Sequence, residues 1–153
     1  MNEQNSHASR FESLMAIAEN HAPARRTDCG YLAALYILSA DDELYSLART
    51  KIDDEGIHFS ALLKAARRFW LSDIQITAAR AANSLFNDGC ASVTPSDLAR
   101  CDYDMLDIIT NALYIRKGGR VPVPCSDGRI ILDTAAEQRS RAFSAAMDDR
   151  FLA

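Results

Sequence analysis

Apolar residues recur at steps of three and four along most of the chain, and this spacing predicts a succession of amphipathic helices. In the first of them, Phe11, Leu14, Met15 and Ala18 fall on one face. The alanines of a later helix would let it approach its neighbours closely. The predicted helical segments are 9–20, 29–39, the stretch that follows Asp42, 58–70, 73–87, 95–101, 103–116 and 135–149.

Side chains that cap helix N-termini precede several of these segments. Asp28, Ser72 and Asp102 each stand directly before a helical pattern. The segment Thr94-Pro95-Ser96-Asp97 adds proline at the first helical position and an acid in the first turn. Such side chains accept hydrogen bonds from the free N–H groups of the first turn, so they predict where each helix begins.

Near the C-terminus the helical spacing gives way to a pattern that predicts a β-hairpin. The segment runs from Val121 to Leu132, with Ser126-Asp127-Gly128 between its halves. A three-residue turn with Gly128 as the left-handed bulge residue puts Pro122 and Pro124 at positions that need no N–H. We therefore expect the three-residue turn.

One face of this hairpin is apolar and has to be covered. We expect it to pack on the last helix or on a second copy of the chain, which would make the protein a homodimer. The residues of this face are Pro122, Pro124, Ile130 and Leu132.

Together these elements predict a mainly α fold, a compact multi-helix domain of about seven or eight helices with one β-hairpin near the C-terminus. The length of 153 residues is that of one domain. We expect a single domain over 1–153, with residues 1–8 frayed, a helical core at 9–117, the hairpin within 119–133 and a C-terminal helix at 134–150.

The composition is that of an ordinary globular protein, with 48% hydrophobic and 25% charged residues. No window resembles a membrane span, and the N-terminal residues lack the pattern of a signal peptide. The net charge of −4 disfavours general binding to a nucleic-acid backbone. We expect a cytoplasmic protein that does not bind membranes.

Sequence motifs for common chemistries are absent. The chain has no phosphate-binding glycine loop, no nucleophile elbow and no zinc-protease motif. Its four cysteines, Cys29, Cys90, Cys101 and Cys125, include no close pair of the kind that zinc or iron–sulfur sites use. We expect reduced, mostly buried thiols, no metal and no cofactor.

One enzymatic alternative rests on Cys29, which opens an apolar helix in Thr27-Asp28-Cys29-Gly30-Tyr31-Leu32. Helix N-terminal amides favour a thiolate. These six residues resemble the nucleophile segment of papain-like peptidases, which implies a cysteine-dependent hydrolase. His58 begins a predicted helix, whereas that family places its histidine on a strand, and no third residue can be nominated.

A second alternative is a winged-helix-like regulator that binds nucleic acid. The helices predicted at 73–87, 95–101 and 103–116, followed by a hairpin, have the order of a winged helix. Acidic residues outnumber basic ones in 94–116, where Asp97, Asp102, Asp104 and Asp107 oppose Arg100 and Arg116. A phosphate surface repels such a helix, so charge disfavours this alternative.

The middle of the chain, about 30–115, resembles a small helical family of unknown function. The resemblance is carried by Tyr36-Ile37-Leu38-Ser39, by the helix at 78–87 and by the Pro95-Ser96-Asp97 restart. Asp88 intrudes between Asn87 and Gly89, and the hairpin and last helix lie outside the pattern. The family is encoded largely by bacteria, phages and other mobile elements, and it implies a helical core without catalytic residues to carry over.

A concentration of basic residues marks one candidate binding surface. Lys64, Arg67 and Arg68 come just before Phe69 and Trp70. One interpretation is a solvated helix end with Trp70 in the core, since lone tryptophans are usually buried. The other places Trp70 at the rim of a basic patch that binds a partner, because arginine and aromatic side chains dominate interface energetics.

A well-patterned core without a catalytic constellation favours a non-enzymatic interaction protein. The resemblance implies a bacterial or prophage origin, and we expect an accessory protein of a phage or mobile element, such as an inhibitor of a host defence complex. We expect a protein partner, with Lys64, Arg67, Arg68 and Trp70 as the binding residues. The hydrolase using Cys29 and the nucleic-acid regulator are the alternatives.

Overall fold

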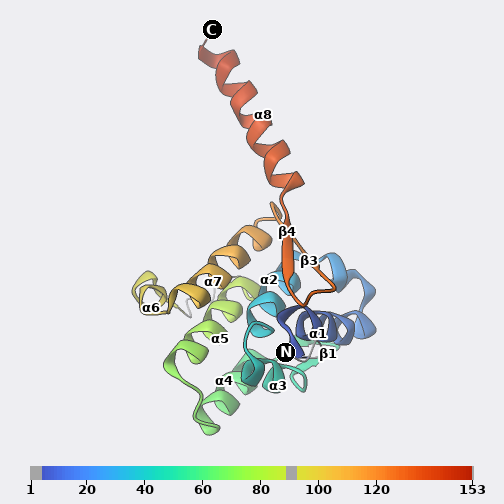
Figure 1. The fold of residues 1–153 in the computed structure, drawn as a ribbon, viewed down its shortest axis with the longest axis vertical. Helices are drawn as coiled ribbons and strands as arrows, with labels where there is room; N and C mark the ends of the chain where they lie inside the picture. The colour runs from blue at the N-terminus through green and yellow to red at the C-terminus, as the bar shows by residue number, and fades with distance from the viewer. Residues whose placement is uncertain (1–4, 89–92, 153) are drawn as a thin grey trace.

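Helices occupy most of the chain in the computed structural model, which describes residues 5–88 and 93–152 (Figure 1). A mainly α fold is therefore confirmed. Two short antiparallel hairpins, β1–β2 and β3–β4, interrupt the described helices. The elements are α1 (His7–His21), η2 (Pro23–Thr27, a 3-10 helix), α2 (Cys29–Leu38), α3 (Asp42–Ala48), β1 (Ile52–Asp53), β2 (Gly56–Ile57), α4 (Phe59–Arg68), α5 (Asp73–Phe86), α6 (Pro95–Ala99), α7 (Tyr103–Arg116), β3 (Val121–Pro124), β4 (Ile130–Asp133) and α8 (Ala135–Leu152).

The predicted caps begin the helices that follow them. The Asp28 carboxylate accepts hydrogen bonds from the backbone N–H groups of Gly30 and Tyr31, at 2.8 and 3.1 Å. Ser72 and Thr94 form capping boxes, and Asp102 accepts a bond from the first turn of α7. These starts are determined by neighbouring residues alone, which is why the sequence predicts them.

Helix α1 begins two residues earlier than predicted. The Ser6 hydroxyl accepts a hydrogen bond from the Ser9 backbone N–H, and the His7 ring bonds the Tyr36 carbonyl. Residues 5–8, which we expected to fray, are therefore held in place. The expectation for residues 1–4 lies outside the described residues.

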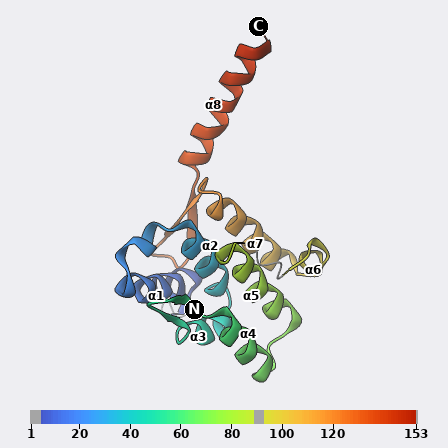
Figure 2. The ribbon, with the colours of Figure 1, turned by 180° about the vertical axis from the view of Figure 1, so that it is seen from behind.

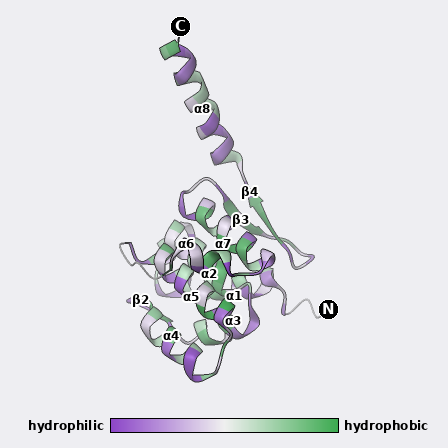
Figure 3. Ribbon diagram, turned by 90° about the vertical axis from the view of Figure 1, so that its left-hand side faces the viewer, coloured by the Kyte–Doolittle hydropathy of each residue, from purple (hydrophilic) through white to green (hydrophobic). Residues whose placement is uncertain are grey.

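Helix α2 is the centre of the fold (Figure 2). It packs against α1, η2, α5 and α7, and its residues from Ala33 to Leu38 are buried on every side. In Figure 3 most of this helix is coloured hydrophobic, as expected for a helix surrounded by others. Helix α5 approaches α2 through a fully or almost fully buried alanine face, which is Ala78, Ala79, Ala81 and Ala82.

A short hairpin, β1–β2, was not predicted. The expected single hairpin is therefore one of two, because two-residue strands give no alternating pattern to detect. The buried Arg25 guanidinium donates to the carbonyls of Asp53 and Asp54 at 2.6 Å each. A cation from a distant segment thus holds the acidic turn.

The C-terminal hairpin has the predicted turn. The Cys125 backbone N–H donates to the Arg129 carbonyl, and Gly128 has the positive φ of +87° that a bulge residue needs. Pro122 pairs with Leu132, and Pro124 pairs with Ile130. Both pairs alternate with hydrogen-bonded ones, so neither proline lacks a required donor.

The inner face of this hairpin is covered by the N-terminal part of the chain. Strand β3 packs on α1 and α2, and Ile130 and Leu132 contact the main core. The expectation that this face covers the last helix or a second copy is therefore wrong. Sequence spacing showed an apolar face but not which distant element covers it.

Helix α8 projects from the body of the molecule (Figure 1). It has the predicted position, but none of its residues is buried, and Phe143 and Phe151 are 69% and 82% exposed. Its apolar positions therefore do not contribute to the core. Across the described residues, no helix has the length and apolar character needed to cross a membrane.

Candidate functional site

The strongest surface feature is a basic–aromatic patch at the end of α4, formed by Lys64, Arg67, Arg68, Phe69 and Trp70. All five side chains are exposed, and Trp70 is 91% exposed. Within the described part of the chain, none of the three cations forms an ion pair. The interpretation that Trp70 lies in the core is therefore wrong.

Backbone hydrogen bonds explain why Trp70 points outward. The Leu71 N–H donates to the Ala66 carbonyl at 3.0 Å, and the Trp70 N–H donates to the Arg67 carbonyl at 3.2 Å. This pair of bonds is the Schellman motif that ends many helices. Leu71 is 8% exposed and fixes the turn from inside, which leaves the preceding residue in solvent.

Trp70 occupies the position of this motif that usually holds glycine. Its φ is +59°, and it is the sole non-glycine residue with a positive φ among those described. A left-handed conformation costs an L-residue with a Cβ about 1–2 kcal/mol. The exposed indole thus stands at a strained position, and strained positions concentrate at functional sites.

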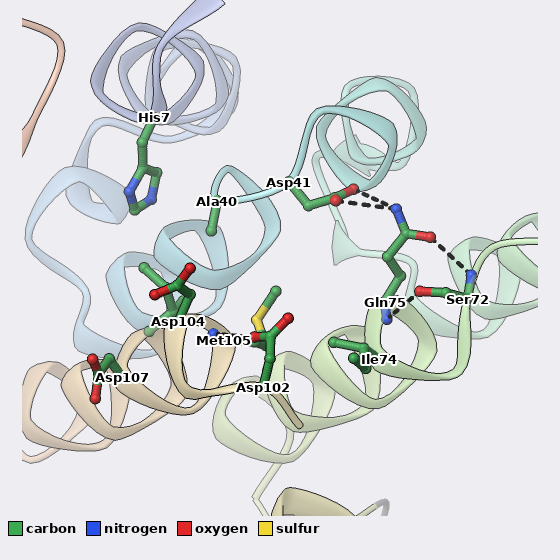
Figure 4. Close-up of a pocket in the computed structure, with 11 residues that line it drawn as sticks. His7, Ala40, Asp41, Ser72, Ile74, Gln75, Asp102, Asp104, Met105 and Asp107 are labelled. Carbon is green, nitrogen blue, oxygen red and sulfur yellow. Dashed lines mark hydrogen bonds between the residues drawn. The ribbon is translucent and has the colours of Figure 1, made fainter. Parts of the chain in front are cut away.

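A second feature, an acidic cleft of about 590 Å³, lies beside the start of α5 (Figure 4). Asp41 caps α3 and forms one side of the cleft, while Ser72 and Gln75 from α5 form the next. The first turns of α7 close the remaining side. The side chains that give the cleft its chemistry are Asp41, Asp102, Asp104, Asp107, Ile74, Met105 and Ile108.

The carboxylates of the cleft differ in whether they already form hydrogen bonds or ion pairs within the chain. Asp41 accepts hydrogen bonds from the Gln75 side-chain amide at 3.0 Å through both oxygens, and Asp102 caps α7. Asp104 and Asp107 are exposed and form no ion pair with any described residue. Two carboxylates therefore face solvent without a cation.

His7 lies at the margin of this cleft and does not offset its charge. Burial is the main cause that lowers the pKa of the His7 imidazole, outweighing the hydrogen bond to the Tyr36 carbonyl. The ring is consequently neutral at physiological pH. The cleft therefore keeps a net negative charge, and its apolar lining consists of Ile74, Met105 and Ile108.

The cleft could have been suspected from the sequence. The acids of residues 102–107 stand out as the reason why α7 would repel DNA, and the same acids line the cleft. What the sequence could not show is that Asp41 and Gln75, distant in the chain, lie opposite them.

The described residues bring no histidine to Cys29. The pocket beside Cys29 is lined by Asp28, Gly30, Tyr31, Phe86, Asp88 and Arg116. His58 bonds Asp53 at 2.6 Å instead, and His21 bonds Asp54. No described histidine is therefore placed to act as a base for this thiol.

The cysteine and metal expectations can be compared with the described residues. Cys29, Cys101 and Cys125 are free thiols of intermediate exposure, so the expectation of mostly buried thiols is wrong for these three. Cys90 lies outside the described residues. Over residues 5–88 and 93–152, no cluster of side chains is arranged to hold a metal ion.

The winged-helix order of elements is present without a wing beside α7. Helices α5, α6 and α7 precede the β3–β4 hairpin as predicted, but β3 packs on α1 and α2. The exposed Asp104 and Asp107 occupy the early turns of α7 that would have to approach DNA. This geometry does not favour major-groove binding.

In comparisons with known proteins, no family model, curated protein or solved structure matched the chain. Its function is therefore inferred from the geometry of the patch and the cleft.

Proposed function

We propose that this chain is a non-enzymatic interaction protein that binds an acidic protein partner through Lys64, Arg67, Arg68 and Trp70. The observation that carries the proposal is Trp70, 91% exposed at a left-handed turn position that favours glycine. A large aromatic residue at this position opposes stability. Backbone strain of this kind is concentrated at functional sites.

The chemistry of the patch fits protein recognition. Tryptophan and arginine are the side chains most enriched among residues that dominate interface energies. None of the three cations forms an ion pair with a described residue, and the Arg68 guanidinium contacts only the neighbouring Phe69 ring, so a carboxylate on another molecule can pair with them without displacing an ion pair. Long-range attraction would also speed the encounter with an acidic surface.

The resemblance of residues 30–115 supports a bacterial or prophage origin, and the missing catalytic constellation supports a more specific proposal. The chain would act in the cytoplasm as an accessory protein of a phage or mobile element, such as an inhibitor of a host defence complex. It would need no cofactor. The Cys29 hydrolase and the nucleic-acid regulator remain the alternatives.

Affinity capture from a bacterial host lysate tests this proposal. Arg67→Glu combined with Arg68→Glu should reduce the captured partner at least about tenfold, because interfaces depend on a few residues of this kind. The melting temperature should not change, since both side chains are exposed. Arg139→Glu with Arg150→Glu is the control, because it alters net charge equally at exposed positions of α8 that form no ion pair among the described residues.

Three outcomes would contradict the proposal. Unchanged capture by the folded patch variant would show that the patch is only a helix end. Loss of capture after nuclease treatment would favour a nucleic-acid partner. Rapid alkylation of Cys29 alone by iodoacetamide at neutral pH would favour the hydrolase.

A further inference from the structure

We propose that two copies of the chain form a reciprocal dimer, in which the basic–aromatic patch of each copy enters the acidic cleft of the other. This inference rests on the proposed function in one respect, because it takes the patch as a protein-docking surface. It identifies the acidic partner as a second copy of this chain.

Charge complementarity is the first reason. The patch presents three cations without ion pairs among the described residues, and the cleft presents Asp104 and Asp107 in the same condition. Asp104 and Asp107 stand three residues apart on α7, so they lie on one helix face. Arg67 and Arg68 are exposed on the last turn of α4, and the proposed contact pairs them with these two carboxylates of a second copy.

The apolar parts of the two surfaces also match. Ile74, Met105 and Ile108 line the cleft between its carboxylates. Trp70 offers an exposed indole next to the cations that would meet those carboxylates. A thioether such as that of Met105 packs favourably against an aromatic ring. The cleft of about 590 Å³ is of the size that holds bulky organic groups.

The position of the two surfaces allows the pairing to close. The patch ends at Trp70 and one wall of the cleft begins at Ser72, so an edge of the cleft lies two residues along the chain from the patch. In a two-fold dimer, residue i of one copy contacts residue j of the other, and j contacts i. Adjacent complementary surfaces can satisfy this condition twice in one interface.

The single tryptophan makes the dimer directly observable. Sedimentation equilibrium should be combined with emission spectra from about 1 μM to about 1 mM protein. We expect the mass to double and the Trp70 emission to shift to shorter wavelength over the same concentration range. Both changes should disappear in about 1 M salt, which screens the charges.

A charge exchange tests reciprocity. One variant carries Arg67→Glu and Arg68→Glu, and the other carries Asp104→Lys and Asp107→Lys. In a dimer of either variant alone, residues of like charge would face each other at both patch–cleft contacts. Each variant alone should therefore dimerise at least about tenfold more weakly. Mixed together, they form two complementary contacts, so the doubled mass and the emission shift should return. Arg139→Glu with Arg150→Glu should dimerise like the unaltered chain, because both positions are exposed on α8.

The outcomes separate this inference from the proposed function. A monomer at every concentration overturns the dimer, and so does a dimer whose Trp70 emission stays unchanged. If both variants are folded but do not associate when mixed, the patch of each copy does not bind the cleft of the other, and the reciprocal arrangement is wrong. If the dimer fails while the patch variant still loses its captured partner, the proposed function stands and the partner is another protein.

Discussion

Trp70 shows how one residue can combine a structural cost with a binding property. Its backbone completes the Schellman motif through hydrogen bonds to Arg67 and from Leu71 to Ala66. Those bonds require a left-handed residue, and the indole stays 91% exposed. Almost no buried contact of the side chain offsets the strain of the backbone.

Trp70→Gly should therefore stabilise the folded chain. We expect the free energy of unfolding to rise by about 1 kcal/mol, since glycine adopts a positive φ without the steric cost. Urea unfolding in high salt, where the proposed dimer dissociates, measures the change. Trp70→Ala keeps a Cβ at the same position and should gain less. Equal stability of the two variants would show that the backbone carries no strain.

His7 should give the protein a pH-dependent stability. Burial lowers the pKa of its imidazole below 6.5, so between the two pKa values the unfolded chain binds more protons than the folded one. Stability is therefore complete above the unfolded pKa and is lost as pH falls through the folded pKa. The melting temperature should drop between about pH 7.5 and about pH 5.5.

His7→Gln should flatten this slope, because the glutamine amide can donate to the Tyr36 carbonyl and does not titrate. The melting temperatures of both proteins at the two pH values measure the difference. Carboxylates with a lowered pKa, such as those of Asp53 and Glu137, titrate below this range. An identical slope in both proteins would assign the pH dependence to another group.

Among the elements, α8 is held at its first turns alone. The Arg120 Nε donates to the Glu137 carboxylate at 2.7 Å, and the Glu137 N–H donates to the Gly119 carbonyl at 3.0 Å. The Arg120 guanidinium also lies 3.7 Å from the centre of the Tyr114 ring. Arg141 bonds Glu137, and among the described residues no hydrogen bond or ion pair joins the part of α8 beyond Arg141 to the body.

Ending the chain after Arg141 should leave the body intact. No residue of α8 is buried, so we expect the melting temperature to change by less than about 2 °C. Far-UV circular dichroism should report the lost helix and the melting temperature together.

A shorter chain that ends after Asp133 is the matched control. It removes Glu137 and leaves the Arg120 guanidinium without its carboxylate, so its melting temperature should fall further. If the chain that ends after Arg141 loses much of its stability, the outer part of α8 packs on the body or on a second copy in solution.

For the whole molecule, the features set by neighbouring residues were predictable. Asp28, Ser72, Thr94 and Asp102 cap helices because their side chains reach N–H groups two or three residues away. The turn at Gly128 follows equally from local backbone geometry. Such signals need no knowledge of the tertiary fold.

The features that depend on distant segments were not predictable from spacing. Burial statistics favoured a buried Trp70, but the bond from Leu71 turns it outward. The acids of α7 were visible, yet only the fold places Asp41 across from them. Likewise the apolar stripe of 135–149 predicts a helix, whereas its exposure depends on where the hairpin directs it.

The direction of α8 decides how the protein can be attached to a support. Its 18 residues extend about 27 Å, and its end points away from the α4–α5 turn (Figure 1). A fusion or immobilising tag after Leu152 would therefore leave both proposed docking surfaces open. At the opposite end of the described residues, Ser6 lies against the turn at Gly128, where an added Cβ would come within 2.8 Å of the Ser6 Cβ.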